Sequence, residues 1–170
     1  MEKIEFVPLA LDALEGDTAR SLSYWRQLTG QREMPTWREF DLMKVPATLI
    51  RTSHVVDIEN DADDFIFRFW GTGSAEIHNQ ELTGRYLSEM RPLELGRLAI
   101  ANIKQLIAAR QPIAVTTTLM SRSQPEKFQV ILRLPLSDDG IRVTHAVTIT
   151  EFPLGRYYSR EAFEKHDEDS

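Results

Sequence analysis

The sequence contains no cysteine among its 170 residues. This absence excludes disulfides, thiolate zinc sites, cysteine-ligated iron–sulfur clusters, thioether-linked haem and a cysteine nucleophile. It also excludes a photochemical adduct between cysteine and flavin. Long hydrophobic runs are missing as well, because no stretch approaches the roughly 18 apolar residues of a membrane-spanning helix. The N-terminus lacks the basic start and apolar run of a signal peptide, so we expect a cytoplasmic protein with no membrane partner.

Basic charge is also scarce. The chain carries 20 Lys and Arg against 26 Asp and Glu, a net charge of −6, and no block of Lys or Arg interrupts this balance. Binding to nucleic acid therefore loses its main electrostatic driving force, and we expect no nucleic-acid partner. Hydrophobic residues make up 42% of the chain, which is typical of one globular domain with a sizeable core. We see no internal repeat and no second domain.

The first part of the chain predicts helices. Asp17 is placed to cap a helix that ends at Gly30, and Leu22 and Trp25 lie on one side of it. The run that begins at Thr36 has capping-box spacing and predicts a second, short helix that stops before Pro46.

The rest of the chain mixes strands with one long helix. Two alternating runs, 54–59 and 65–70, are joined by a polar turn and predict an antiparallel hairpin. Pro92 then opens the best helix of the chain, whose apolar stripe ends at Pro112. Three further alternating runs lie at 113–119, 128–134 and 143–149. Two groups of antiparallel strands separated by helices indicate an α+β domain.

The two glycines of Gly71-Thr72-Gly73, which follow the second strand, raise the question of a phosphate-binding loop. A dinucleotide loop needs a third glycine where this chain has Glu76, and a carboxylate there would repel pyrophosphate. The neighbouring strands are antiparallel, so the parallel βαβ unit of such sites is not available. We therefore reject this interpretation.

Another interpretation rests on resemblance. The stretch FRFWGTGSAEIHNQELTGRYLSEM, from Phe67 to Met90, resembles the centre of a PAS domain of the short stand-alone bacterial kind. In that group a strand ends in Arg-x-x-Gly-Thr, here Arg68 to Thr72, and a short helix leads to Asp/Glu-Leu-Thr-Gly-Arg, here Glu81 to Arg85. The resemblance covers roughly Leu22 to Pro153. We assign Gly71 and Gly84 to sharp reversals of the backbone.

The resemblance implies a five-stranded antiparallel sheet flanked by helices. It divides the chain into N-terminal leader helices (1–45), a PAS-like core (46–153) and a polar C-terminal tail (154–170). PAS domains bind haem, flavin or small metabolites, or pair with proteins, so we expect a non-enzymatic sensory or regulatory module in bacterial signalling. Its cofactor is left unidentified. The candidate ligand-binding residues are Asn102, His145, His54, Thr117, Phe67 and Phe69.

The polar candidates each have a competing structural role. His54 and His145 lie on the apolar sides of strands that PAS topology places next to each other, which suits a ligand contact or haem ligation. We favour the alternative of core histidines held by hydrogen bonds, because most buried polar groups are simply satisfied in this way. Asn102 falls on the apolar stripe of the long helix, so it needs a partner, either a ligand or a structural group. His78 is expected to be solvated.

Strand alternation also predicts an interface. Trp70 is expected on the face opposite Phe67, together with Ile131, and this apolar patch needs a cover. The leader helix with Leu22 and Trp25, or a second subunit, would supply it, so we expect a homodimer or a signalling partner protein. Arg133 and Arg68 alternate away from their apolar neighbours and are expected in solvent or at an interface.

No catalytic constellation emerges from the sequence. A cone-shaped cavity enzyme of the ketosteroid isomerase kind is one alternative, but that chemistry wants a carboxylate aimed into an apolar cavity. Here the inward strand positions carry Phe, Val, Leu, Ile and His, and Asp57 points the other way. A ligand-free structural adaptor with a filled core is the other alternative.

Overall fold

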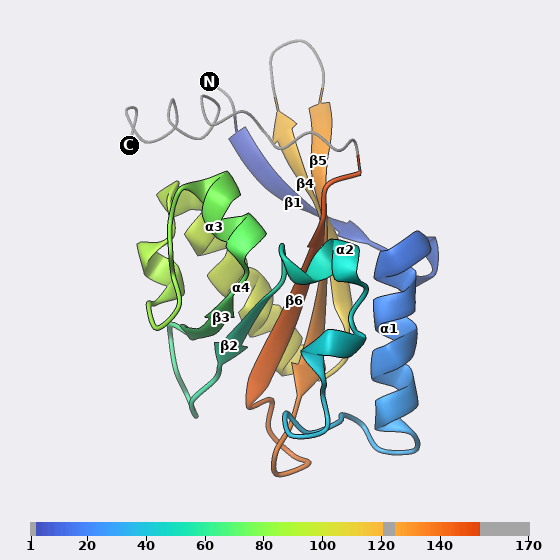
Figure 1. Ribbon diagram of the computed structural model, residues 1–170. Coiled ribbons are helices and arrows are strands. Elements are labelled where there is room, and N and C mark those ends of the chain that lie inside the picture. The colour runs from blue at the N-terminus through green and yellow to red at the C-terminus, as the bar shows by residue number, and fades with distance from the viewer. Residues whose placement is uncertain (1–2, 121–124, 154–170) are drawn as a thin grey trace.

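The computed structural model of the chain describes residues 3–120 and 125–153. It contains one six-stranded antiparallel sheet in the order β1–β4–β5–β6–β2–β3 (Figure 1). The strands are β1 Lys3–Leu9, β2 His54–Asp57, β3 Ile66–Trp70, β4 Ile113–Met120, β5 Pro125–Leu136 and β6 His145–Glu151. The α-helices are α1 Gly16–Thr29, α2 Ala47–Ile50, α3 Thr72–His78 and α4 Leu93–Ala109, and short 3₁₀ helices cover Leu11–Ala13, Leu42–Lys44 and Leu87–Glu89.

The predicted α+β fold is confirmed, but the sheet has six strands where we expected five. The additional strand, β1, pairs with β4 at one edge of the sheet, with Phe6 opposite Thr117. Its residues belong to the segment that was expected to form leader helices. Pro8 is tolerated there because an edge strand does not need every N–H for pairing. The division at residue 45 stays a prediction, and the predicted tail, 154–170, lies outside the described residues.

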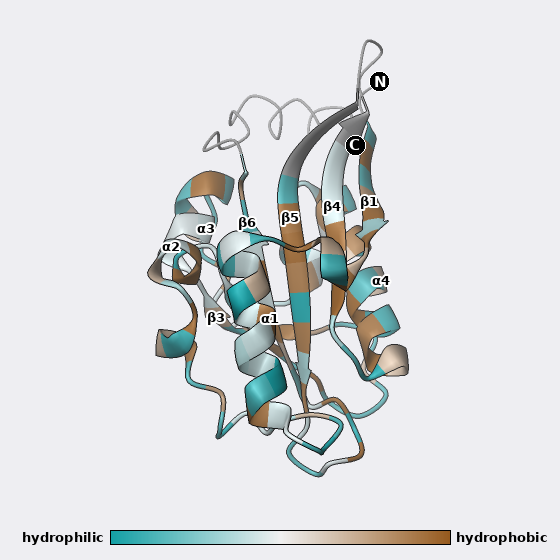
Figure 2. Ribbon diagram, turned by 90° about the vertical axis from the view of Figure 1, so that its right-hand side faces the viewer, coloured by the Kyte–Doolittle hydropathy of each residue, from teal (hydrophilic) through white to brown (hydrophobic). Residues whose placement is uncertain are grey.

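The two faces of the sheet carry different helices. On one face α1 packs over β5 and β6, where the Trp25 indole donates to the Pro135 carbonyl at 2.8 Å and Thr18 donates to Glu151 at 2.6 Å. On the other face α4 contacts β5 and β1. Figure 2 views the sheet from the α1 side, with mainly hydrophobic residues along β5 behind the helix. None of the described helices is long and apolar enough to cross a membrane.

The leader differs from expectation in its details. Helix α1 begins after Glu15, so Asp17 lies inside its first turn and pairs with Arg20 and with the Thr48 hydroxyl instead of capping. The capping-box hydrogen bonds between Thr36 and Glu39 do form, at 2.9 and 3.2 Å. They close a turn and not a helix. The next helical segments are Leu42–Lys44 and α2.

Gly71 has a steric role and not the conformational one that we predicted. Its backbone is ordinary extended chain, with φ −62°, whereas Gly84 does adopt the left-handed region at φ +78°. A Cβ on Gly71 would overlap the Arg51 carbonyl and lie 2.8 Å from the Ser53 carbonyl oxygen. The Gly71 and Ser74 amides donate to these same two carbonyls at 3.0 and 3.1 Å. The start of α3 is therefore occupied by the chain itself, in keeping with our rejection of a phosphate loop.

We predict that Gly71→Ala destabilises the fold by about 3 kcal/mol or more, because rigid backbone surrounds the site and cannot give way. Gly84→Ala is the control: it meets open space and only the strain of a positive φ, which costs roughly 1–2 kcal/mol. Urea unfolding of both variants measures the difference. Equal losses would show that the close approach at Gly71 does not constrain the fold.

Candidate functional site: a cavity around a buried arginine

A cavity lies between the sheet and the helices α3 and α4. Its volume is about 30 Å³, and its lining comes from both sheet edges as well as from the centre. Polar and apolar side chains both face it. The lining residues are Phe6, His54, Trp70, Ser74, His78, Met90, Leu95, Ala99, Gln129, Ile131, Arg133, Thr150 and Phe152.

Arg133 is the charged residue of this lining, and the structure contradicts our expectation that it faces solvent or an interface. It sits on the central strand β5 and is only 2% exposed. Its Nε donates to the Asn102 side-chain carbonyl at 2.7 Å, and its Nη1 donates to the Thr148 hydroxyl at 2.6 Å. Alternation does take Arg133 away from Leu132 and Leu134, but α4 covers that second face too.

The partners of Arg133 among the described residues are both neutral. Burial lowers the pKa of the guanidinium to about 9, which still leaves it charged at neutral pH. A guanidinium has five N–H donors, and the two printed contacts use two of them. A buried cation without a carboxylate partner is costly, so this group is the electrostatic centre of the cavity.

Asn102 has the partner that its buried position requires. Its carbonyl accepts from Arg133, and its amide donates to the Gln105 side chain at 3.2 Å. Asn102 itself does not line the cavity but holds Arg133 toward it from α4. Its predicted role as a direct ligand contact stays a prediction. Thr117 is fully buried opposite Phe6 and Gln129, and its hydroxyl finds no hydrogen-bond partner among the described residues.

We had expected the two strand histidines to face the same side of the sheet, but they face opposite sides. β2 and β6 are neighbours, but His54 pairs with Thr148 and faces the cavity, whereas His145 pairs with Asp57. Thr148 and His145 are three positions apart on one strand, so their side chains point to opposite faces. His145 stacks on Trp37 of the leader, with ring centroids 5.5 Å apart.

His145 belongs to a polar cluster that fastens the leader to the sheet. Its Nε2 lies 3.4 Å from Asp57 and its Nδ1 lies 3.6 Å from Asp138. Arg68 donates to Asp57 at 2.6 Å and lies over the Trp37 ring. Arg68 is half exposed, as the sequence predicted for it. Burial is the largest influence on His145 and lowers its pKa, against the opposing effect of the two aspartates.

Trp70 lies on the same side as Phe67, which contradicts our expectation of opposite faces. Phe69 pairs with Val55 and Phe67 pairs with Val56, so Arg68 is an extra residue in the ladder, a β-bulge. The bulge shifts the alternation by one position and brings the Phe67 and Trp70 rings to 4.9 Å. His54 contacts both rings, and Trp70 then lines the cavity together with Ile131. Phe69 falls on the other face.

The residues predicted to form an interface are buried within this one chain. Leu22 is 3% exposed and Trp25 is 5% exposed, because α1 covers its own sheet. Trp70 and Ile131 are covered from the other side, at the cavity. A homodimer through any of them stays a prediction, and it would require these elements to separate first.

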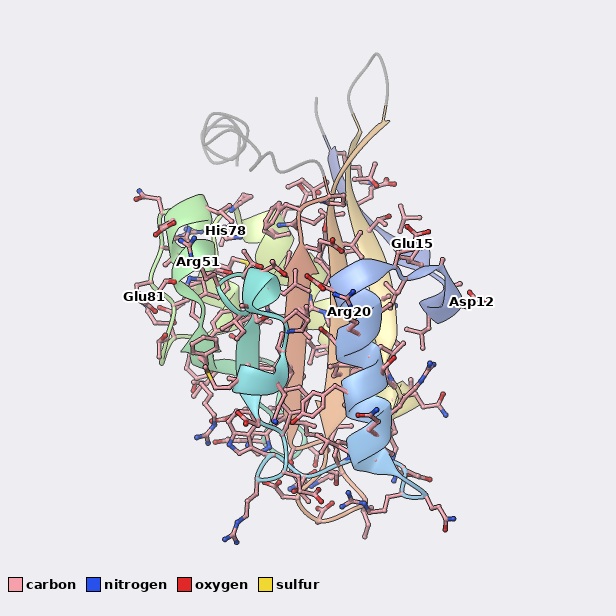
Figure 3. All side chains as sticks on the ribbon, turned by 45° about the vertical axis from the view of Figure 1, so that its right-hand side comes forward. Asp12, Glu15, Arg20, Arg51, His78 and Glu81 are labelled. Atoms are coloured by element: carbon pink, nitrogen blue, oxygen red, sulfur yellow. The ribbon has the colours of Figure 1, made fainter. Side chains whose placement is uncertain are left out.

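Sequence reasoning missed several lining residues. His78 was expected in solvent, but α3 directs it to the cavity, its Nδ1 is shielded, and burial lowers its pKa to about 4. Figure 3 shows His78 on α3 and Arg20 on α1, on different flanks of the sheet. Phe6 was missed with β1. The sequence did contain a signal for Arg133. It lies between Leu132 and Leu134 on a strand, and a charged residue in such a place must be either solvated or buried with partners.

A large cofactor does not fit this cavity. Sites for drug-sized ligands measure roughly 300–1,000 Å³, whereas the volume here is about 30 Å³. The haem or flavin that some PAS domains carry would therefore require the surrounding side chains to move. Burial, and next the positive charge of Arg133, lowers the pKa of His54 far below its usual value, so its ring is neutral at pH 7.

Comparison with known proteins identifies the family. The sequence matches the PAS domain family over residues 15–147, so the chain belongs to that family, whose members are generally sensory modules. No curated protein matches the sequence.

Several solved structures of light–oxygen–voltage (LOV) domains are similar to this one. A fungal LOV domain photoreceptor is 18% identical, with a TM-score of 0.43, covering 66% of this chain and 79% of its own. The dark structure of the Aureochrome1 LOV domain is 14% identical, with a TM-score of 0.45 and coverages of 76% and 91%. An RNA-binding LOV receptor is 15% identical, with a TM-score of 0.46, covering 99% of this chain and 42% of its own.

We predict that Asn102→Leu lowers the free energy of unfolding by about 2–3 kcal/mol, because Arg133 loses a charged hydrogen bond. The double variant Asn102→Leu/Arg133→Met should lose less stability than the two single variants together, by at least about 1 kcal/mol. Urea unfolding of the four proteins measures this coupling. Ala101→Leu, at an exposed position next to Asn102 on α4, is the control and should stay within about 0.5 kcal/mol of wild type. Additive losses would contradict a coupled pair.

We predict that stability falls as the pH falls from 6.5 to 4. Burial holds the pKa of His78 at about 4, below its unfolded value of 6.5, so the unfolded state binds more protons in this window. The loss from His78 alone is roughly 2–3 kcal/mol, and buried His54 acts in the same direction. Unfolding by urea at several pH values measures it, and His78→Gln should flatten the profile. Asp139, with a pKa of about 2, contributes only below the window. An unchanged profile in the variant would refute the assignment.

Proposed function

We propose that this chain is a non-enzymatic sensory PAS module that binds a small molecule in the cavity around Arg133. The observation that carries the proposal is the convergence of polar side chains, among them His54, Ser74 and Arg133, on one cavity with an apolar wall. Ligand sites combine an apolar wall with a few placed polar groups in this way. The apolar wall here is formed by Trp70, Met90, Leu95, Ala99 and Ile131.

The proposed signal passes through β5 and β6, which contact the cavity on one face of the sheet and α1 on the other. Thr148 and Thr150 of β6 face Arg133 and the cavity, and Glu151 on the same strand accepts from Thr18 of α1. On β5, Pro135 holds Trp25 of α1 two residues beyond Arg133. A ligand that favours one arrangement of these strands would shift the population of docked and released leader, provided that its affinity for the two states differs. The recipient would be a signalling partner protein or a second copy of the chain.

Two other functions compete with this proposal. The small volume of the cavity favours a ligand-free adaptor, in which side chains fill the core. A cone-shaped cavity enzyme is less well supported, because none of the described residues that line the cavity is acidic. A general base of the kind that such chemistry uses would have to come from His54 or His78, both of which are neutral but buried.

Native mass spectrometry of the freshly purified chain tests the proposal. We expect a bound small molecule in the wild type and its loss in Ala99→Phe, which fills the cavity from α4. Ala109→Phe, at the exposed end of the same helix, is the control and should keep the adduct. A clean apo mass for the wild type, together with no stabilisation of the fold by a panel of small acids, amides and alcohols, would favour the adaptor.

A further inference from the structure

Arg133 places a positive charge where none of the described lining residues supplies a negative one. The partners of its guanidinium among the described residues are the Asn102 amide oxygen and the Thr148 hydroxyl. The other titratable side chains that line the cavity are His54 and His78, and neither is acidic. Both are held neutral at pH 7 by burial, which lowers their pKa values. The described residues of the lining therefore carry a net charge of one positive unit.

The remaining donors of Arg133 point to one kind of ligand. Asn102 occupies Nε and Thr148 occupies one hydrogen of Nη1. The end of the guanidinium, with the second Nη1 hydrogen and both hydrogens of Nη2, is left for a further acceptor. Two parallel N–H groups at that end match the two oxygens of a carboxylate. Ser74 and His54 add a hydroxyl and a neutral imidazole to the same lining.

Size and polarity narrow the choice further. A volume of about 30 Å³ holds roughly two water molecules, the space of a carboxylate with one or two carbons. A single buried charge is balanced by a monoanion, whereas a dianion would leave an uncompensated negative charge. The wall formed by Met90, Leu95 and Ala99 is apolar and suits a short alkyl group.

We propose that the cavity is a binding site for a small monocarboxylate, whose carboxylate group pairs with the guanidinium of Arg133. This inference rests on the proposed function and specifies the chemical class of its ligand. Asn102 and Thr148 are positioning residues, since they fix the guanidinium plane without contacting the ligand.

The three tryptophans of the chain provide the test, because they report on different places. Trp70 lines the cavity. Trp25 of α1 donates a hydrogen bond to the Pro135 carbonyl, and Trp37 of the leader stacks on His145. The uniformly ¹⁵N-labelled full chain is titrated with sodium acetate at constant ionic strength, and the indole N–H signals are followed by NMR. Parallel titrations with acetamide, its neutral isostere, and with sodium chloride are the ligand controls. Trp70→Phe assigns the signal.

We expect a saturable shift of the Trp70 signal with acetate, half complete in the millimolar range, and no comparable shift with acetamide or chloride. Any shift of the Trp25 and Trp37 signals should follow the same saturation curve, because the proposed function has the ligand act on leader docking. Arg133→Met should raise the half-saturation concentration at least about tenfold, while Arg26→Gln, an exposed arginine of α1, should leave it unchanged. If Arg133→Met does not fold, the comparison of acetate with acetamide on the wild type decides the matter.

Three results would overturn the proposal: no shift, an equal shift with chloride or acetamide, or an unchanged response in folded Arg133→Met. Failure here is distinct from failure of the proposed function. A neutral molecule retained in native mass spectrometry, with no response to acetate, would leave a sensor with another class of ligand. A clean apo mass together with no response to acetate would remove both.

Discussion

The buried guanidinium of Arg133 is the constraint on which the rest of this structure depends. It lies at the centre of the sheet and joins three elements, because β5 carries it while α4 and β6 supply its hydrogen-bond acceptors. A charged group in this position cannot move without losing contacts that water does not replace. The spacing between α4 and the sheet is therefore set by a polar contact as well as by the apolar stripe of the helix. The cavity is the space that this arrangement leaves.

Two local irregularities complete the cavity, and both depend on single residues. The bulge at Arg68 turns Trp70 inward, so that it forms one aromatic group with Phe67 and His54. Immediately afterwards Gly71 lets the chain pass against the carbonyls of Arg51 and Ser53 and enter α3 without a gap. A regular strand would have sent Trp70 to the α1 face, and any side chain at residue 71 would have pushed α3 away. This part of the cavity wall thus follows from the segment 68–71.

The sequence predicted the elements better than their faces. The hairpin of β2 and β3, the long helix α4 and the last three strands follow from periodicity, which depends on local burial alone. β1 was missed because charged residues and Pro8 weaken its alternation, and an edge strand needs apolar residues at fewer positions. The faces of Trp70 and His145 depended on a bulge and on pairing partners, which a period of two does not reveal. The same limit hid Arg133, because alternation shows that a residue leaves one face but not that a helix covers the other.

A central buried arginine is poor evidence for stability, so we seek its value in function. A hydrophobic residue of similar size in the place of a buried charge is often neutral or stabilising. A site that binds an acid gains affinity from that same unbalanced charge, since the ligand removes the electrostatic cost when it enters. The strands that bear the charge also bear the contacts of α1, because the Pro135 carbonyl of β5 accepts from Trp25 and Glu151 of β6 accepts from Thr18. In the proposed sensor, a change in the charge state of the cavity would act on the same backbone that positions the leader, with no chain of side chains needed to connect the two faces.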